Sequence, residues 1–178
     1  LRHNSREEAQ KFVSDALVKN AGDYATNLIA GYFALNQNDM KGALKYFSVA
    51  ADAEKEGDNY LNALFAKGKA EISLKKNEAA KKTFNEIVRV FPGSELGYKG
   101  LLSVYLIEDN AVGGRDKLVA YAKKNAQLAP YYVLIQEAIA LQDVPAAKSY
   151  YQKVLKTKSD DDGVKRLGNA IKYVEALL

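Results

Sequence analysis

The sequence lacks most of the residues on which enzyme chemistry depends. It has no cysteine and a single histidine, His3, in 178 residues. The absence of cysteine excludes disulfides, thiol nucleophiles and cysteine-ligated zinc. His3 lies in an N-terminus that we predict to be disordered, so we expect no Ser-His-Asp site. We therefore predict a protein that is not an enzyme, with no catalytic residues, no cofactor and no metal.

Membrane-spanning and secretion signals are also absent. No apolar run approaches the roughly 20 residues that a helix needs to cross a bilayer. No signal peptide is visible, and the chain begins at Leu1 instead of Met. We expect a trimmed or processed chain, for which an anchor upstream of Leu1 is possible.

Two short motifs resemble ligand sites but lack the required pattern. Gly113-Gly114-Arg115 has no Gly-Lys-Ser/Thr frame, so we interpret it as a flexible turn between helices. The run Asp160-Asp161-Asp162 lacks the spaced oxygens of a calcium loop and is typical of a helix cap. The net charge is only +4 and arginine occurs five times, so nucleic acid is not an expected partner.

Helix-forming residues dominate what remains. Ala, Leu, Lys and Glu are abundant, only three prolines interrupt them, and no segment alternates with period two. The sequence therefore predicts an all-α fold of about ten helices and no sheet. We place the helices at about 5–18, 23–37, 40–56, 58–75, 77–91, 94–108, 113–128, 130–141, 143–157 and 162–178.

One group of a glycine, an alanine and a phenylalanine occurs twice, 37 residues apart. Its members are Gly31, Ala43 and Phe47, and then Gly68, Ala80 and Phe84. A glycine in the first helix of a pair lets the second helix approach closely. The alanine suits the crossing point of the two helices. The phenylalanine four residues later lies on the same face and can fill the space between neighbouring pairs.

This pattern resembles the tetratricopeptide repeat, which pairs small residues with an Ala-x-x-x-aromatic motif in about 34 residues. The resemblance implies one right-handed α-solenoid of stacked antiparallel helix pairs over residues 1–178. A half-repeat at 5–18, with the capping-box pattern Ser5-x-x-Glu8, would begin it, and a capping helix at 162–178 would end it. The full repeats are predicted at about 23–56, 58–92, 94–130 and 130–158. The third has lost the Ala/Phe signature, and we take its register from Gly100.

The resemblance also implies a concave groove lined by the first helix of each pair. Positions carried over by register give candidate partner-binding residues, which mix aromatic, amide and lysine side chains suited to a peptide. They are Leu28, Tyr32, Asn36, Phe65, Lys69, Ser73, Tyr105, Tyr132 and Gln136. The same tyrosines and Phe65 could equally be core residues between repeats. Leu28 and Tyr32 stand where relatives that bind a terminal carboxylate have Lys and Asn, so that ligand is not favoured.

We predict a non-catalytic scaffold or adapter that binds a partner protein or peptide in this groove. One alternative is a structural module that self-associates through the apolar end formed by Val174, Leu177 and Leu178. Another is a regulatory subunit of an enzyme or of a nucleic-acid complex. The block 79–95 is similar to repeats of bacterial envelope proteins, so an envelope location is as much expected as a cytoplasmic one. The sequence predicts neither the identity of the partner nor the oligomeric state.

Overall fold

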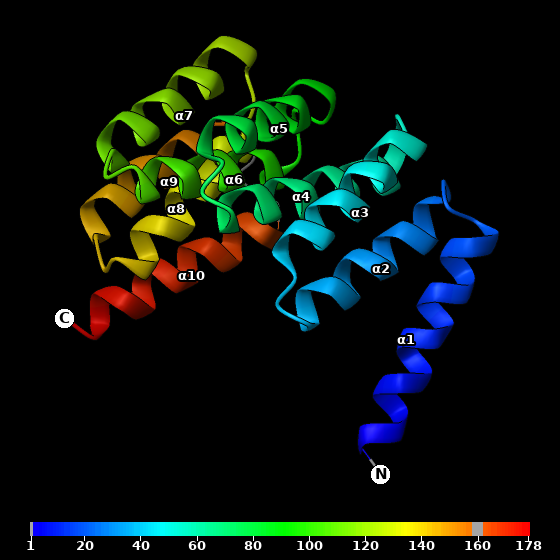
Figure 1. Ribbon diagram of the computed structural model, residues 1–178. Helices are drawn as coiled ribbons and strands as arrows, with labels where there is room; N and C mark the ends of the chain where they lie inside the picture. The colour runs from blue at the N-terminus through cyan, green and yellow to red at the C-terminus, as the bar shows by residue number, and fades with distance from the viewer. Residues whose placement is uncertain (1, 158–161) are drawn as a thin grey trace. The chain divides into compact units, whose positions relative to one another are not determined.

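A computed structural model describes residues 2–157 and 162–178, in which every regular element is an α-helix (Figure 1). The prediction of ten helices and no strand is confirmed for these residues. The helices are α1 (Arg2–Lys19), α2 (Tyr24–Asn36), α3 (Met40–Ala53), α4 (Gly57–Ser73), α5 (Asn77–Val90), α6 (Glu95–Ile107), α7 (Ala111–Asn125), α8 (Ala129–Ala140), α9 (Val144–Leu155) and α10 (Asp162–Ala176).

Several local predictions are wrong. Helix α1 begins at Arg2, so the backbone is helical at His3 and the helix begins before Ser5. Gly113 and Gly114 lie inside α7 and are not a turn. Of the acidic run, Asp162 begins α10, whereas Asp160 and Asp161 lie outside the described residues.

The chain divides into two compact units, Leu1–Phe91 and Pro92–Leu178. In the N-terminal unit each of the helices α1 to α5 packs against the next along the chain. In the C-terminal unit consecutive helices pack in the same way from α6 to α10, and α8 also contacts both α6 and α10. Consecutive packing of this kind is the fold of an α-solenoid. That the two units form one uninterrupted array stays a prediction.

The four turns inside helix pairs share one geometry. Each contains a left-handed residue, and the residue after it donates its N–H to the carbonyl five positions earlier. The left-handed residues are Asn38, Lys75, Asp109 and Gln142. The N–H···O distances are 2.9 Å for Asp39 to Ala34, 2.9 Å for Lys76 to Glu71, 2.8 Å for Asn110 to Tyr105 and 2.8 Å for Asp143 to Ala138. The N-caps are therefore equivalent, and they lie 37, 34 and 33 residues apart.

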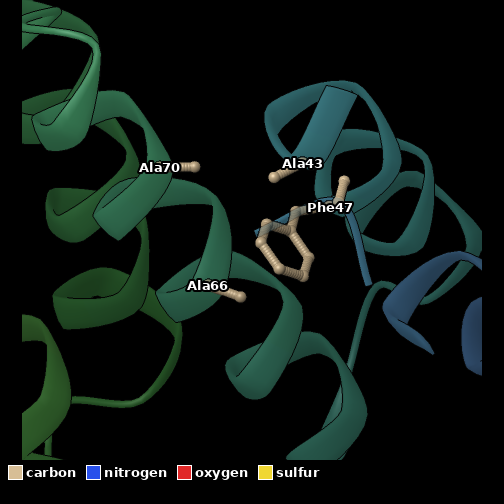
Figure 2. Close-up of a cluster of buried hydrophobic side chains, with 5 residues drawn as sticks. Ala43, Phe47, Ala66 and Ala70 are labelled. Carbon is tan, nitrogen blue, oxygen red and sulfur yellow. The ribbon is translucent and has the colours of Figure 1, made fainter. Parts of the chain in front are cut away.

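In the N-terminal unit, the glycine of each first helix is covered by the phenylalanine of the second. A Cβ on Gly31 would lie 2.3 Å from Phe47, and a Cβ on Gly68 would lie 2.6 Å from Phe84. Both phenylalanine side chains are fully buried. Figure 2 shows the Phe47 ring near Ala66, with Ala43 and Ala70 beside them. Phe47 thus joins its own pair to the next helix, as the repeat pattern predicts.

The third pair packs at equivalent positions, with one residue larger and one smaller than in the first pair. Counting from the N-cap Asn110, Gly114 takes the place of Ala43, and Tyr105 takes the place of Ala34. Tyr105 fills the room that the glycine leaves, because a Cβ on Gly114 would lie 2.7 Å from the Tyr105 Cβ. Leu118, fully buried, stands where Phe47 stands in the first pair. The third helix pair therefore packs at equivalent positions although the signature residues are not there.

Candidate functional site

The predicted groove residues of α2 lie on one face of the helix, one turn apart. Leu28 packs against the core cluster around Phe47. Tyr32 is 53% exposed, with its ring edge-on to Phe47 at 5.2 Å between centroids. Asn36 is exposed at the end of the helix. One side of this row therefore belongs to the core, and Tyr32 and Asn36 face solvent.

Helix α4 presents the equivalent row, 37 residues later. The half-buried Phe65 ring lies 6.1 Å from the Phe84 ring, and Lys69 Nζ is 5.8 Å from the centroid of Phe65. Ser73 donates its hydroxyl to the Lys69 carbonyl at 3.1 Å. Phe65 is thus partly a packing residue, while Lys69 and Ser73 are exposed.

A cleft of about 500 Å³ lies in the C-terminal unit between α8 and α10, with one residue from α6. Its lining mixes an aromatic ring, an amide, two opposite charges and small apolar groups. The lining residues are Glu95, Tyr132, Gln136, Gly163, Arg166, Leu167 and Ala170. The predicted Tyr132 and Gln136 both lie here. Gln136 Nε2 donates to Glu95 Oε2 at 3.1 Å, and Lys99 pairs with the same carboxylate oxygen at 2.8 Å.

An ion pair between α7 and α8 stabilises the position of α8. Arg115 donates to both carboxylate oxygens of Glu137, from Nε at 2.9 Å and from Nη2 at 2.8 Å. This hydrogen bonding raises the pKa of Arg115. A bidentate pair constrains both side chains. Since Glu137 follows Gln136 directly, the pair supports the part of α8 that lines the cleft.

Tyr105 is the one predicted groove residue that the structure buries. It is 7% exposed, packs against Gly114 and accepts a hydrogen bond from Lys117 Nζ at 2.9 Å. It lies five residues before an N-cap, where Ala34 and Ala138 are also buried. The register taken from Gly100 was therefore wrong.

The residues of α6 that match the predicted rows are Lys99, Ser103 and Ile107. They lie eleven, seven and three residues before Asn110, as Tyr132 and Gln136 lie eleven and seven before Asp143. Ser103 repeats the Ser73 interaction, donating to the Lys99 carbonyl at 2.8 Å. The sequence did contain a signal for this register. Asp39, Asn110 and Asp143 are all N-cap residues that begin a second helix.

The described residues show neither a metal site nor a membrane-spanning helix. Within 2–157 and 162–178, no group of three or more His, Cys, Asp or Glu side chains could hold a metal ion. In the same ranges, no helix has the length and apolar character needed to cross a bilayer.

The chain is similar to known proteins in the sequence of one segment and in its fold. Residues 62–94, covering most of α4 and all of α5, match the family model of the tetratricopeptide repeat. No curated protein matches the sequence. The crystal structure of a tetratricopeptide repeat protein from Parabacteroides merdae is similar, with a TM-score of 0.51 and 13% identity. The similarity covers 86% of this chain and 60% of that one. Residues 62–94 thus match a tetratricopeptide repeat, and the chain has a fold similar to that of a tetratricopeptide repeat protein.

Proposed function

We propose that the protein is a non-catalytic adapter that binds a partner protein. The binding surface is the exposed face of the first helix in each helix pair. Tetratricopeptide folds are generally modules of protein–protein interaction. The observation that carries the proposal is the cleft that holds Tyr132 and Gln136, because two residues chosen from the repeat register line the same hollow.

The chemistry of the cleft suits a peptide segment. Leu167 and Ala170 provide an apolar wall, and about 500 Å³ is room for one or two side chains of a partner. Gln136 and Glu95 can hydrogen-bond to backbone amides, and Arg166 can pair with a carboxylate. In the N-terminal unit, Tyr32, Lys69 and Ser73 offer the same mixture of one ring and polar groups on exposed positions.

Photo-crosslinking tests this proposal directly. A photoreactive amino acid at Gln136 is expected to crosslink one partner protein in an extract of the source cell. The same amino acid at Lys153, exposed on α9, is the matched control and is expected to capture nothing in common. Equal capture at both positions, or capture only at Lys153, would contradict binding in the cleft.

Two substitutions at exposed positions provide a second test of the proposal. Arg166→Glu and Tyr32→Ala are expected to weaken partner binding at least about tenfold, with the melting temperature preserved because both side chains are exposed. Lys153→Glu makes the same change of charge away from the cleft and should bind like the wild type. A Tyr32→Ala variant that melts well below the wild type would instead identify Tyr32 as a packing residue.

We extend the proposal to a partner in the bacterial envelope. The block 79–95 supports it, since its resemblance to repeats of envelope proteins falls largely in the segment that matches the family model. Fractionation of the source cell, with antibody detection of the protein, is expected to find it with the envelope fraction. A signal confined to the cytosol would contradict this location.

A further inference from the structure

A second hollow lies in the C-terminal unit, between α9 and α10. Its volume is about 400 Å³. Tyr151, Gly168 and Ile171 are half-buried or buried in its floor, and the rim includes Lys148, Lys165 and Lys172. None of its residues lines the cleft described above, so an occupant of this pocket would not compete for the same side chains.

The floor of this pocket is shaped like a contact between repeat helices. Gly31 and Gly68 are each covered by the ring of a phenylalanine from the following helix. At Gly168 the nearest group is the hydroxyl of Tyr151, 2.4 Å from where a Cβ would stand. Gly168 therefore leaves space that the Tyr151 side chain partly fills. The adjoining pocket, of about 400 Å³, has room for a further aromatic ring.

The rim of the pocket is positively charged. Three of its residues are lysines and none is a carboxylate. Lys148 pairs with Glu175, and Lys165 lies 3.7 Å from Asp162, but neither acid lines the pocket. Lys172 forms no ion pair with any of the described residues. An apolar floor within such a rim fits an aromatic side chain that has carboxylates on its own helix face.

Helix α1 carries such a face. Phe12 is 67% exposed, although a phenylalanine is ordinarily an interior residue. Glu8 stands one turn before it and Asp15 one turn after it, with Lys19 two turns after it, and all three are exposed. The half-buried Val13 and Leu17 lie on another side of the helix. The Phe12 face is therefore open in the described structure.

We propose that the Phe12 face of α1 in one copy of the chain docks into the α9–α10 pocket of a second copy. The Phe12 ring enters the pocket beside Gly168, and Glu8 and Asp15 lie against the lysine rim. The two surfaces are different parts of the chain, so the contact is heterologous and each copy offers one of each. This association is separate from the proposed partner binding and does not depend on it.

Sedimentation velocity over a wide concentration range tests the proposal. The wild type is expected to associate as concentration rises. Phe12→Ala removes the ring, and Gln152→Glu/Lys172→Glu makes the pocket rim acidic; each is expected to weaken association at least about tenfold. Val18→Ala, at an 87% exposed position on another side of α1, is the matched control and should associate like the wild type.

A mixture of the two blocked variants provides the decisive result. The pocket of Phe12→Ala is intact, and so is the α1 face of Gln152→Glu/Lys172→Glu, so together they are expected to form a 1:1 dimer that neither forms alone. A wild type that stays monomeric throughout would overturn the proposal. So would a mixture without dimers, or a Val18→Ala variant as impaired as Phe12→Ala.

Discussion

At the scale of single residues, the fold depends on where side chains are missing. Gly31, Gly68 and Gly114 each lie in a helix with an aromatic side chain over the position of the absent Cβ. At Gly114 the large residue is in the first helix, and at Gly31 and Gly68 it is in the second. What each pair requires is therefore a small residue opposite a large one, and either helix can supply the small one.

Gly68→Ala tests how tightly this packing is fitted. The added methyl group would lie 2.6 Å from two ring carbons of the fully buried Phe84, so the ring or the helix must shift. Overpacking of this kind costs about 1–3 kcal/mol. We expect urea unfolding to show a free energy of unfolding lower by that amount, despite alanine's better helix propensity.

The matched control is Gly93→Ala, since nothing lies within 4 Å of the Cβ that it would add. Its free energy of unfolding should change by no more than about 0.5 kcal/mol. If Gly68→Ala proved as stable as Gly93→Ala, the close approach at Gly68 would not be a requirement of the fold.

At the scale of elements, the four equivalent turns differ in how well they cap the next helix. Asp39, Asn110 and Asp143 each accept a hydrogen bond from the backbone N–H three residues on, at 2.8, 3.2 and 3.0 Å. The equivalent residue before α5 is Lys76, which makes no side-chain cap. A lysine also places positive charge at the positive end of the helix dipole.

Lys76→Asp should therefore stabilise the protein. The new carboxylate can accept the N–H of Ala79, as Asp39 accepts that of Gly42, and the charge now opposes the dipole. Capping effects are about 0.5–2 kcal/mol, so we expect a rise of about 1 kcal/mol in thermal or urea unfolding. Lys76→Ala removes the charge without adding a cap and should give less than half of that gain. Equal gains in both variants would assign the effect to charge alone.

At the scale of the whole molecule, the contacts divide into two units. Each helix is stabilised by its neighbours along the chain, so damage to one helix is felt first by the helices beside it. Phe47 joins three consecutive helices. It belongs to α3, covers Gly31 of α2 and packs with Ala66 and Ala70 of α4.

Phe47→Ala should therefore damage the two units unequally. Loss of a buried phenylalanine costs about 3–5 kcal/mol where its contacts are made. Hydrogen exchange read helix by helix is expected to lose protection in α2, α3 and α4 and to keep most of it in α8 and α9. A uniform loss along the chain would mean that the two units unfold as one.

Part of the candidate site could be predicted from sequence, because the N-cap residues at the turns set the register of the helices before them. Tyr132 and Gln136, taken from the fourth predicted repeat, both line one cleft, and they precede Asp143 by the same number of residues as Leu28 and Tyr32 precede Asp39. Tyr105 was misplaced because the register of its helix was counted from Gly100. That glycine does not have the role of Gly31 or Gly68.

The sequence by itself determined the number and the approximate bounds of the helices, because helix propensity, caps and breakers act within a few residues. The N-cap Asn110 indicated the register of α6, but only the tertiary structure decided how the residues of α6 fit against the partner helix. That fit brings Tyr105 against Gly114, at the positions that Ala34 and Ala43 hold in the first pair. A tyrosine fits at this crossing because the facing position has no side chain, and the Ala-x-x-x-aromatic signature does not describe such a fit.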